Sequence, residues 1–261
     1  MTRAHATRVP ASDDPLLACL ALTLGFFLLC LWRLWLPSGP FFDEIHYLPA
    51  ARELLTGFDY RNPEHPPLGK EIIAAGIALL GDNPWGWRIF SALAGALALF
   101  AGMRALWHAS LSRDAVLAYG LLLASGFMLF VHAQIAMLDI FMVAFFLTAL
   151  WFFAAACRAG QPVRARALLA LSGIALGCAI ASKWNAAPLA PLLGLGTLVR
   201  QHVAARVEER ADGTRVMLPP GETIGLAPGS PDEASLALPF ARFRALSPDE
   251  VRSPAISPNG S

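Results

Sequence analysis

Six apolar stretches constrain this sequence most, because about 20 apolar residues are enough for a helix to cross the hydrocarbon core of a bilayer. The first, Leu16–Leu36, contains a single charge at Arg33. It is too long for the apolar region of a cleaved signal peptide, and no small-x-small cleavage site follows it. The other five are Trp87–Trp107, Ala115–Val131, Leu138–Cys157, Ala165–Ile180 and Ala186–Val199. We therefore expect an all-α polytopic membrane protein with about six transmembrane helices.

The composition agrees with this class. Hydrophobic residues make up 56% of the chain and charged residues 15%, against roughly 45–50% and 25% in soluble domains. These fractions argue against a soluble enzyme and a disordered chain, and a net charge of +1 gives no reason to expect nucleic acid. Gly173 and Gly177 form a GxxxG pattern, which predicts close helix packing. Buried thiols, without a disulfide framework or zinc site, are expected at Cys19, Cys30, Cys157 and Cys178.

The placement of Lys and Arg predicts the orientation. Basic residues dominate the segments that lie inside if the N-terminus is cytoplasmic, whereas the long loop after the first span has more acids than bases. This predicts a cytoplasmic segment 1–15, a transmembrane domain 16–199 with an outer loop 37–86, and a mostly irregular cytoplasmic tail 200–261. Within the tail, 203–218 is compatible with a small hairpin around Asp212-Gly213.

The outer loop opens with the motif Phe42-Asp43-Glu44-Ile45-His46-Tyr47, directly after the first span. Pro49 is a good first helical residue and Gly57 a good stop, so Pro49–Thr56 is expected to form an amphipathic helix on the membrane. A carboxylate beside an apolar interface can serve as a general base, which makes Asp43 a catalytic candidate. The alternative is that Asp43 is a helix cap or a solvated loop charge.

The second motif of this loop is His65-Pro66-Pro67-Leu68-Gly69-Lys70. The prolines predict a helix that begins at about Pro67, with Lys70 in its first turn. A cation is unfavourable at this end of a helix unless an anion binds there, so the pattern favours a phosphate-type site. The alternative is an interfacial lysine paired with Glu64 or Glu71.

Asp139 is the one formal charge from Ala115 to Cys157, at the outer end of two predicted spans. A carboxylate near hydrocarbon is usually functional or paired. His132 and Gln134 are the candidate partners, and an N-cap of the following helix is the alternative role. One Asp and one His are too few to predict a metal site.

Lys183 lies at the outer turn between the last two spans, beside Trp184. Taken alone it is compatible with an interfacial anchor. However, the topology brings Lys70, Lys183, Asp139 and the acids of the first loop to the same membrane face. This convergence predicts one polar site for a membrane-embedded anionic substrate such as a lipid phosphate.

The two motifs of the first loop resemble those of the protein O-mannosyltransferases, and most closely the bacterial members. The resemblance continues in family order, from about residue 41 to 185, through Trp87-Arg88-x-x-Ser91-Ala92-Leu93-x-Gly95, Ala136-Met137-Leu138-Asp139 and Ser182-Lys183-Trp184. That family belongs to the GT-C class of polyprenyl-phosphate-dependent glycosyltransferases. The resemblance therefore implies a GT-C fold with an amphipathic helical outer loop.

The resemblance also implies roles for individual residues. Asp43 matches the catalytic base, and Glu44 matches the companion acid that positions the acceptor. The expected substrate-binding residues, which include those for the lipid phosphate of the donor, are His46, His65, Lys70, Asp139 and Lys183. The implied reaction transfers a hexose, expected to be mannose, from a polyprenyl phosphate to a Ser or Thr hydroxyl of a protein, with inversion. The lipid-linked sugar is a substrate, no resident cofactor is implied, and metal dependence stays open.

Several readings remain beside this one. The acceptor is a lipid or glycan in the related lipid A aminosugar transferases. A non-catalytic lipid-handling subunit and a proton-coupled transporter that uses Asp139 are further alternatives. Family members have around eleven spans, so we expect the front half of a larger enzyme: a fragment, a remnant, or one half of a split enzyme whose other chain supplies the missing helices. The implied location is the bacterial inner membrane, with the N-terminus cytoplasmic and the active face periplasmic.

Overall fold

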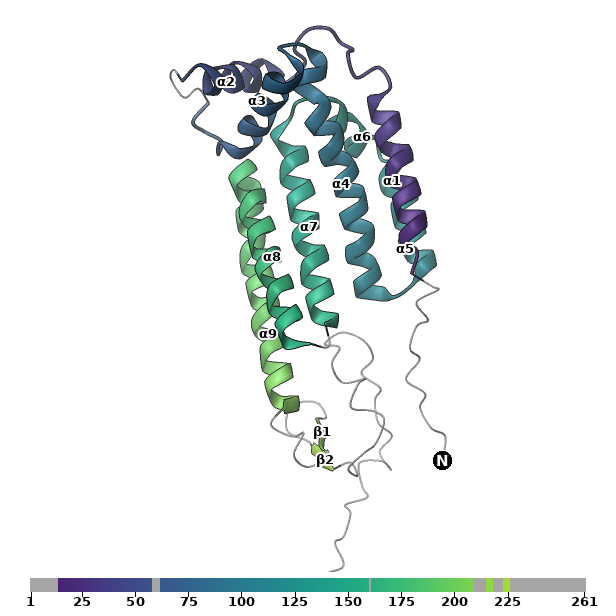
Figure 1. The fold of residues 1–261 in the computed structure, drawn as a ribbon. Coiled ribbons are helices and arrows are strands. Elements are labelled where there is room, and N and C mark those ends of the chain that lie inside the picture. Colours follow the sequence, from purple (N-terminus) through teal and green to yellow (C-terminus); the bar gives the residue numbers. More distant parts are fainter. Residues whose placement is uncertain (1–13, 58–61, 160, 209–214, 218–222, 226–261) are drawn as a thin grey trace, which may run out of the picture. The chain divides into compact units, whose positions relative to one another are not determined.

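The computed structural model describes residues 14–57, 62–159, 161–208, 215–217 and 223–225 and is almost entirely helical (Figure 1). The described residues up to Pro191 form one compact unit, and those from Leu192 onward form another. The first unit holds α1 (Leu16–Leu31), α2 (Glu44–Thr56), α3 (Leu68–Leu80), α4 (Pro84–Ser110), α5 (Arg113–Ala124), α6 (Phe127–Gln134), α7 (Leu138–Arg158), α8 (Pro162–Ser182) and the 3-10 helix η2 (Trp184–Leu189). Helix α9 (Ala190–Glu208) continues into the second unit, which also contains β1 (Arg215–Met217) and β2 (Thr223–Gly225).

The expected helical membrane protein is confirmed. Of the helices that the structure describes, α4, α7 and α8 are long and apolar enough to cross a membrane. The pair α5 and α6 forms a fourth candidate span, bent by 57°. The first and last predicted spans are shorter apolar helices, Leu16–Leu31 and Trp184–Val199. The count of six transmembrane helices is therefore not confirmed.

The interruptions of the predicted spans have local causes. Helix α1 ends at Leu31, and the chain turns at Arg33, whose φ is +62°. The predicted third span breaks at Ser125 and Gly126, where the carbonyl of Leu123 accepts a hydrogen bond from the Gly126 N–H and the helix restarts in a new direction. The last predicted span begins with the 3-10 helix η2, which contains Pro188. Proline cannot supply the N–H that an α-helix interior needs.

Helix α4 is the centre of the first unit and packs against α1, α3, α5, α6 and α7, while α7 also packs along α8 (Figure 1). Small residues let these helices approach closely. A Cβ atom built on Gly95 would lie 2.5 Å from the Cβ of Ala133 on α6, and one on Gly102 would lie 2.6 Å from the Tyr119 hydroxyl. The GxxxG prediction is not confirmed, because among the described residues nothing lies within 4 Å of a Cβ built on Gly173 or Gly177.

Helices α2 and α3 lie at the end of the unit where α4 and α7 begin (Figure 1). The predicted stop at Gly57 is confirmed, with φ +74°, and α3 begins directly after Pro67 as predicted. The predicted start at Pro49 is wrong. Helix α2 already begins at Glu44, since the preceding turn is closed by the Glu44 side chain, and Pro49 lies inside the helix.

Two smaller expectations have different outcomes. Cys19, Cys30 and Cys157 are buried, as expected, whereas Cys178 is partly exposed. The hairpin predicted at 203–218 is wrong in position. The chain is helical to Glu208, and β1 pairs with β2 in antiparallel register, Val216 opposite Ile224. Asp212-Gly213 and most of the predicted tail lie outside the described residues.

We expect Gly95→Ala to destabilise the chain by about 1–3 kcal/mol, because its new methyl group clashes with Ala133 and separates α4 from α6. The matched control is Gly173→Ala, which enters open space and should stabilise by up to about 1 kcal/mol through helix propensity. Thermal unfolding of both variants in detergent measures the difference. Equal melting temperatures would contradict the close packing of α4 on α6.

Candidate active site

The predicted site residues come from four parts of the fold at the same end of the first unit. Asp43 and Glu44 begin α2, His65 precedes α3, Asp139 lies in the first turn of α7, and Lys183 directly follows α8. Helices α3, α7 and α8 contact one another there. The remaining two residues differ in exposure: His46 is exposed in the first turn of α2, while Lys70 on α3 is fully buried.

Asp139 and Lys183 form an ion pair. The Lys183 ammonium donates to both carboxylate oxygens of Asp139 at 2.7 Å. The two side chains keep 25% and 14% of their surface exposed, so the pair borders solvent and is not sealed inside the protein. Because both Asp139 oxygens accept from Lys183 and α7 already begins at Leu138, Asp139 is not the N-cap of this helix. The partners that we expected for Asp139 make other contacts. His132 contacts the Met128 carbonyl. Gln134 donates to the carbonyls of Cys30 and Trp32 at the end of α1.

Tyr47 connects the first loop to this pair, although sequence reasoning assigned it no role. Its buried ring packs edge-on against His65 with 6.0 Å between centroids, and its hydroxyl lies close enough to the Asp43 side chain for that carboxylate to act on its pKa. Burial, and then the negative charges of Asp43 and Asp139, raise the pKa of Tyr47. The hydroxyl therefore stays protonated and can donate a hydrogen bond to a carboxylate.

His65 lies between the charged groups. Its half-buried imidazole has a pKa below the usual 6.5, first because burial disfavours the cation and then because Lys183 and Lys70 are positive. Asp139 acts in the opposite direction but more weakly. His65 is therefore neutral at pH 7 and can offer one hydrogen-bond donor and one acceptor.

Asp43 is half-buried at the N-cap position of α2, and its side chain accepts no cap hydrogen bond. The residue before it, Phe42, has a φ of +56°, an uncommon conformation for a non-glycine residue. Phe42 and Ile45 leave more than half of their side chains exposed. Asp43 thus lies on a constrained turn between apolar surface and the Tyr47 hydroxyl.

Lys70 is placed differently from the expected exposed phosphate ligand. Its ammonium is buried and donates to the backbone carbonyls of Asn62 and His65 at 2.6 and 2.8 Å. Burial lowers the pKa of Lys70, and the charge of Glu64 partly offsets this. These contacts hold the loop that carries His65 against the start of α3.

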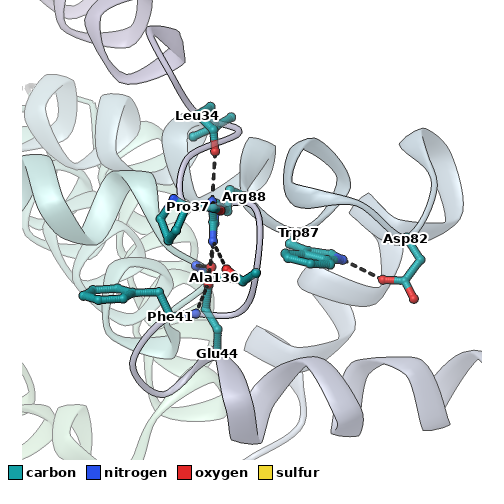
Figure 2. A network of polar contacts seen from close by, with 9 residues as sticks. Leu34, Pro37, Phe41, Glu44, Asp82, Trp87, Arg88 and Ala136 are labelled. Atoms are coloured by element: carbon teal, nitrogen blue, oxygen red, sulfur yellow. Dashed lines mark hydrogen bonds and ion pairs between the residues drawn. The ribbon is translucent and has the colours of Figure 1, made fainter.

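Glu44 is part of a buried network with Arg88 (Figure 2). Arg88 Nε and Nη2 donate to the two Glu44 oxygens at 2.7 Å, and the remaining guanidinium N–H groups reach the carbonyls of Leu34, Pro37 and Gly39. Both side chains are 0% exposed. Arg88 belongs to the third motif of the sequence, yet sequence reasoning gave it no role. The available signal was an arginine at the start of an apolar stretch, where a charge needs a partner.

A second polar contact stabilises the neighbouring loop. Arg52 donates to both oxygens of Asp82 at 2.8 and 3.0 Å. The Trp87 indole N–H donates to the same carboxylate at 2.6 Å, as Figure 2 shows. The Arg52 guanidinium also lies 5.6 Å from the Trp87 ring centroid. These contacts connect α2 to the start of α4.

The site has carboxylates, ammonium groups and one neutral imidazole, which suits acid–base chemistry beside an anion. Across the described residues, no group of three or more His, Cys, Asp or Glu side chains is arranged to hold a metal ion.

Comparison with known proteins finds a matching family model and several similar proteins. The family model described as dolichyl-phosphate-mannose-protein mannosyltransferase matches residues 64–211. A polyprenol-phosphate-mannose–protein mannosyltransferase of Mycobacterium tuberculosis is 32% identical over 241 residues, which cover 79% of this chain and 45% of that protein. The Mycolicibacterium smegmatis protein of the same name is 31% identical over 245 residues, 81% of this chain and 47% of the relative. The chain thus spans about half the length of these relatives.

A further similarity, over a shorter stretch of the chain, is to a protein of Pseudomonas paraeruginosa. It is named undecaprenyl phosphate-alpha-4-amino-4-deoxy-L-arabinose arabinosyl transferase and is 34% identical over 175 residues. These residues cover 61% of this chain and 30% of that protein.

We expect the carbethoxylation rate of His65 to fall on acidification with a midpoint below pH 6.5, because only the neutral imidazole reacts and its pKa is lowered. Peptide-resolved mass spectrometry follows the modification across pH. Lys183→Met should raise the midpoint, since it removes a positive charge beside the ring. A midpoint at or above 6.5 in the unmodified chain would contradict the arrangement described for His65, Lys70 and Lys183.

Proposed function

The chain belongs to the dolichyl-phosphate-mannose–protein mannosyltransferase family, and we propose that it transfers mannose from a polyprenyl-phosphate donor to a Ser or Thr hydroxyl of a protein. It is an integral membrane protein by its apolar helices and its family. The observation that carries the proposal is the convergence of Asp43, Tyr47, His65, Asp139 and Lys183 at one end of these helices. A lipid-linked donor presents its phosphate at such an end, beside the bilayer interface.

Asp43 is the general base of the proposed reaction. The acceptor oxygen attacks the anomeric carbon of mannose, its proton passes to the Asp43 carboxylate, and the bond from the anomeric carbon to the phosphate oxygen breaks. Attack opposite the leaving group inverts the anomeric centre. The Tyr47 hydroxyl, kept protonated by burial, is proposed to orient the nearby Asp43 carboxylate by donating to it.

Lys183 and His65 face the leaving phosphate in this proposal. The Asp139 carboxylate holds the Lys183 ammonium in place without donor, and the donor phosphate competes with Asp139 for it. Neutral His65 adds a hydrogen bond to a phosphate oxygen. Lys70 acts indirectly, because it fixes the backbone of the loop that carries His65.

The proposed setting is the bacterial inner membrane, with the N-terminus cytoplasmic and the site on the periplasmic face, as the distribution of Lys and Arg favours. Segments 1–15, 16–199 and 200–261 are proposed as cytoplasmic N-terminus, membrane domain and cytoplasmic tail. A second chain that supplies further helices stays a prediction.

A lipid acceptor is the second candidate, supported by the similarity to the arabinosyl transferase. Membranes that contain the chain and a labelled polyprenyl-phosphate mannose, offered a Ser/Thr peptide and a lipid acceptor separately, distinguish the two. Label in the peptide supports the first proposal, whereas label only in the lipid supports the second.

We expect Asp43→Asn to reduce mannosyl transfer by at least about 100-fold, because the acceptor hydroxyl then loses its proton acceptor. The matched control is Glu71→Gln, which neutralises an exposed carboxylate on the same outer loop. Transfer by the Asp43→Asn protein at the unmodified rate would refute the assignment of the base.

We expect Lys183→Met to raise the KM for the lipid-linked donor by about 10–100-fold, the value of a lost charge-assisted hydrogen bond. The KM for the acceptor peptide should change little. Arg113→Met is the matched control, since Arg113 is exposed at the opposite end of the unit, at the start of α5. An unchanged donor KM in Lys183→Met would remove Lys183 from the phosphate site.

A further inference from the structure

We propose that Glu44 and Arg88 form a positioning pair that sets the distance between the first-loop base and the Asp139–Lys183 pair, and that Glu44 does not touch the acceptor. The inference rests on the proposed function for its kinetic test, and it has a structural test that is independent of activity. It assigns Glu44 a different task from the companion acid that the family resemblance implied.

The first argument is that Glu44 has no hydrogen-bonding capacity left for a substrate. Its Oε1 accepts from Arg88 Nε at 2.7 Å and from the Ala136 N–H at 2.8 Å, and its Oε2 accepts from Arg88 Nη2 at 2.7 Å and from the Phe41 N–H at 2.8 Å. A carboxylate offers about four acceptor positions, and all are occupied. The side chain is also 0% exposed, so an acceptor hydroxyl could reach it only after the network opened.

Arg88 is equally saturated. A guanidinium has five N–H donors, and they are spent on two Glu44 oxygens and on the carbonyls of Leu34, Pro37 and Gly39. These carbonyls belong to the loop that leads from α1 to the Asp43 turn. Arg88 therefore binds that loop directly as well as through Glu44 (Figure 2).

The pair joins three segments that are far apart in the sequence. Through Phe41 it closes the turn that carries Asp43, through Arg88 it attaches this turn to α4, and through Ala136 it holds the loop before α7. Asp139 lies three residues after Ala136 and holds Lys183. A loss of the pair would thus let the base and the phosphate-facing cation move relative to each other, although neither is itself changed.

The kinetic test is a double-mutant cycle with Glu44→Gln, Arg88→Met and the double variant, with Arg88→Lys added in case Arg88→Met fails to fold. Each rate is divided by the number of donor-binding sites, titrated with a fluorescent polyprenyl phosphate, so that unfolded molecules do not count. We expect each single variant to lose about 10–100-fold in kcat per donor site, as mispositioning does, with the acceptor KM nearly unchanged. Because both residues act as one unit, the double variant should lose no more than about threefold beyond the worse single.

The structural test measures the distance between spin labels at His46→Cys and Trp184→Cys by pulsed electron resonance. Both positions are exposed, one beside the Asp43 turn and the other next to Lys183. We expect a narrow distribution in the otherwise unmodified chain, a broader one in Glu44→Gln and in Arg88→Met or Arg88→Lys, and no change in the control Glu71→Gln.

Any of three results would overturn the inference. The first is a double variant whose loss in kcat is the product of the losses in the two single variants. The second is an acceptor KM that Glu44→Gln raises both in the chain with Arg88 and in the chain with Arg88→Met, and the third is a label distance that the variants leave unchanged. Absence of mannosyl transfer by the unmodified chain with every acceptor would instead count against the proposed function. The label distances would still decide the role of the pair.

Discussion

The arrangement of the candidate site depends on the burial of two opposite charges, Glu44 and Arg88, away from water. Such burial is costly, and it is offset here because every donor of the guanidinium and every acceptor of the carboxylate is used. Removal of one partner from a pair of this kind costs about 3–5 kcal/mol, a large fraction of the stability of an ordinary domain. The membrane helices pack through small residues, whereas this network holds in place the loops that precede α2 and α7.

Much of the architecture was predictable from the sequence, since apolar length and charge placement are local properties. The helical class, the start of α3 after Pro67 and the stop of α2 at Gly57 all depend on neighbouring residues. The convergence of Asp43, Asp139 and Lys183 at one end could also be predicted, because strict alternation of direction in a helical membrane protein assigns each loop to one of two faces.

The partners within the site could not be predicted, because they join residues that are distant in the sequence. Glu44 and Arg88 are 44 residues apart, as are Asp139 and Lys183, and no short-range pattern specifies either pair. The same holds for the early start of α2, which follows from the bond between Glu44 and the Phe41 N–H. Lys70 was expected to face a ligand, but it donates to the backbone carbonyls of residues 62 and 65. These partners could not be predicted, because their positions depend on how the loop folds.

The ion pair of Asp139 and Lys183 has a consequence for how the proposed lipid-linked donor would reach the site. The formal charges of Asp43 and Asp139 cancel those of Lys70 and Lys183, and His65 is neutral at pH 7. A site without net charge projects little long-range field into the aqueous phase, so it does not gather soluble anions by electrostatic steering. The proposed lipid-linked donor would then reach the site by lateral diffusion within the bilayer, with its lipid tail engaged before its phosphate meets the first cation.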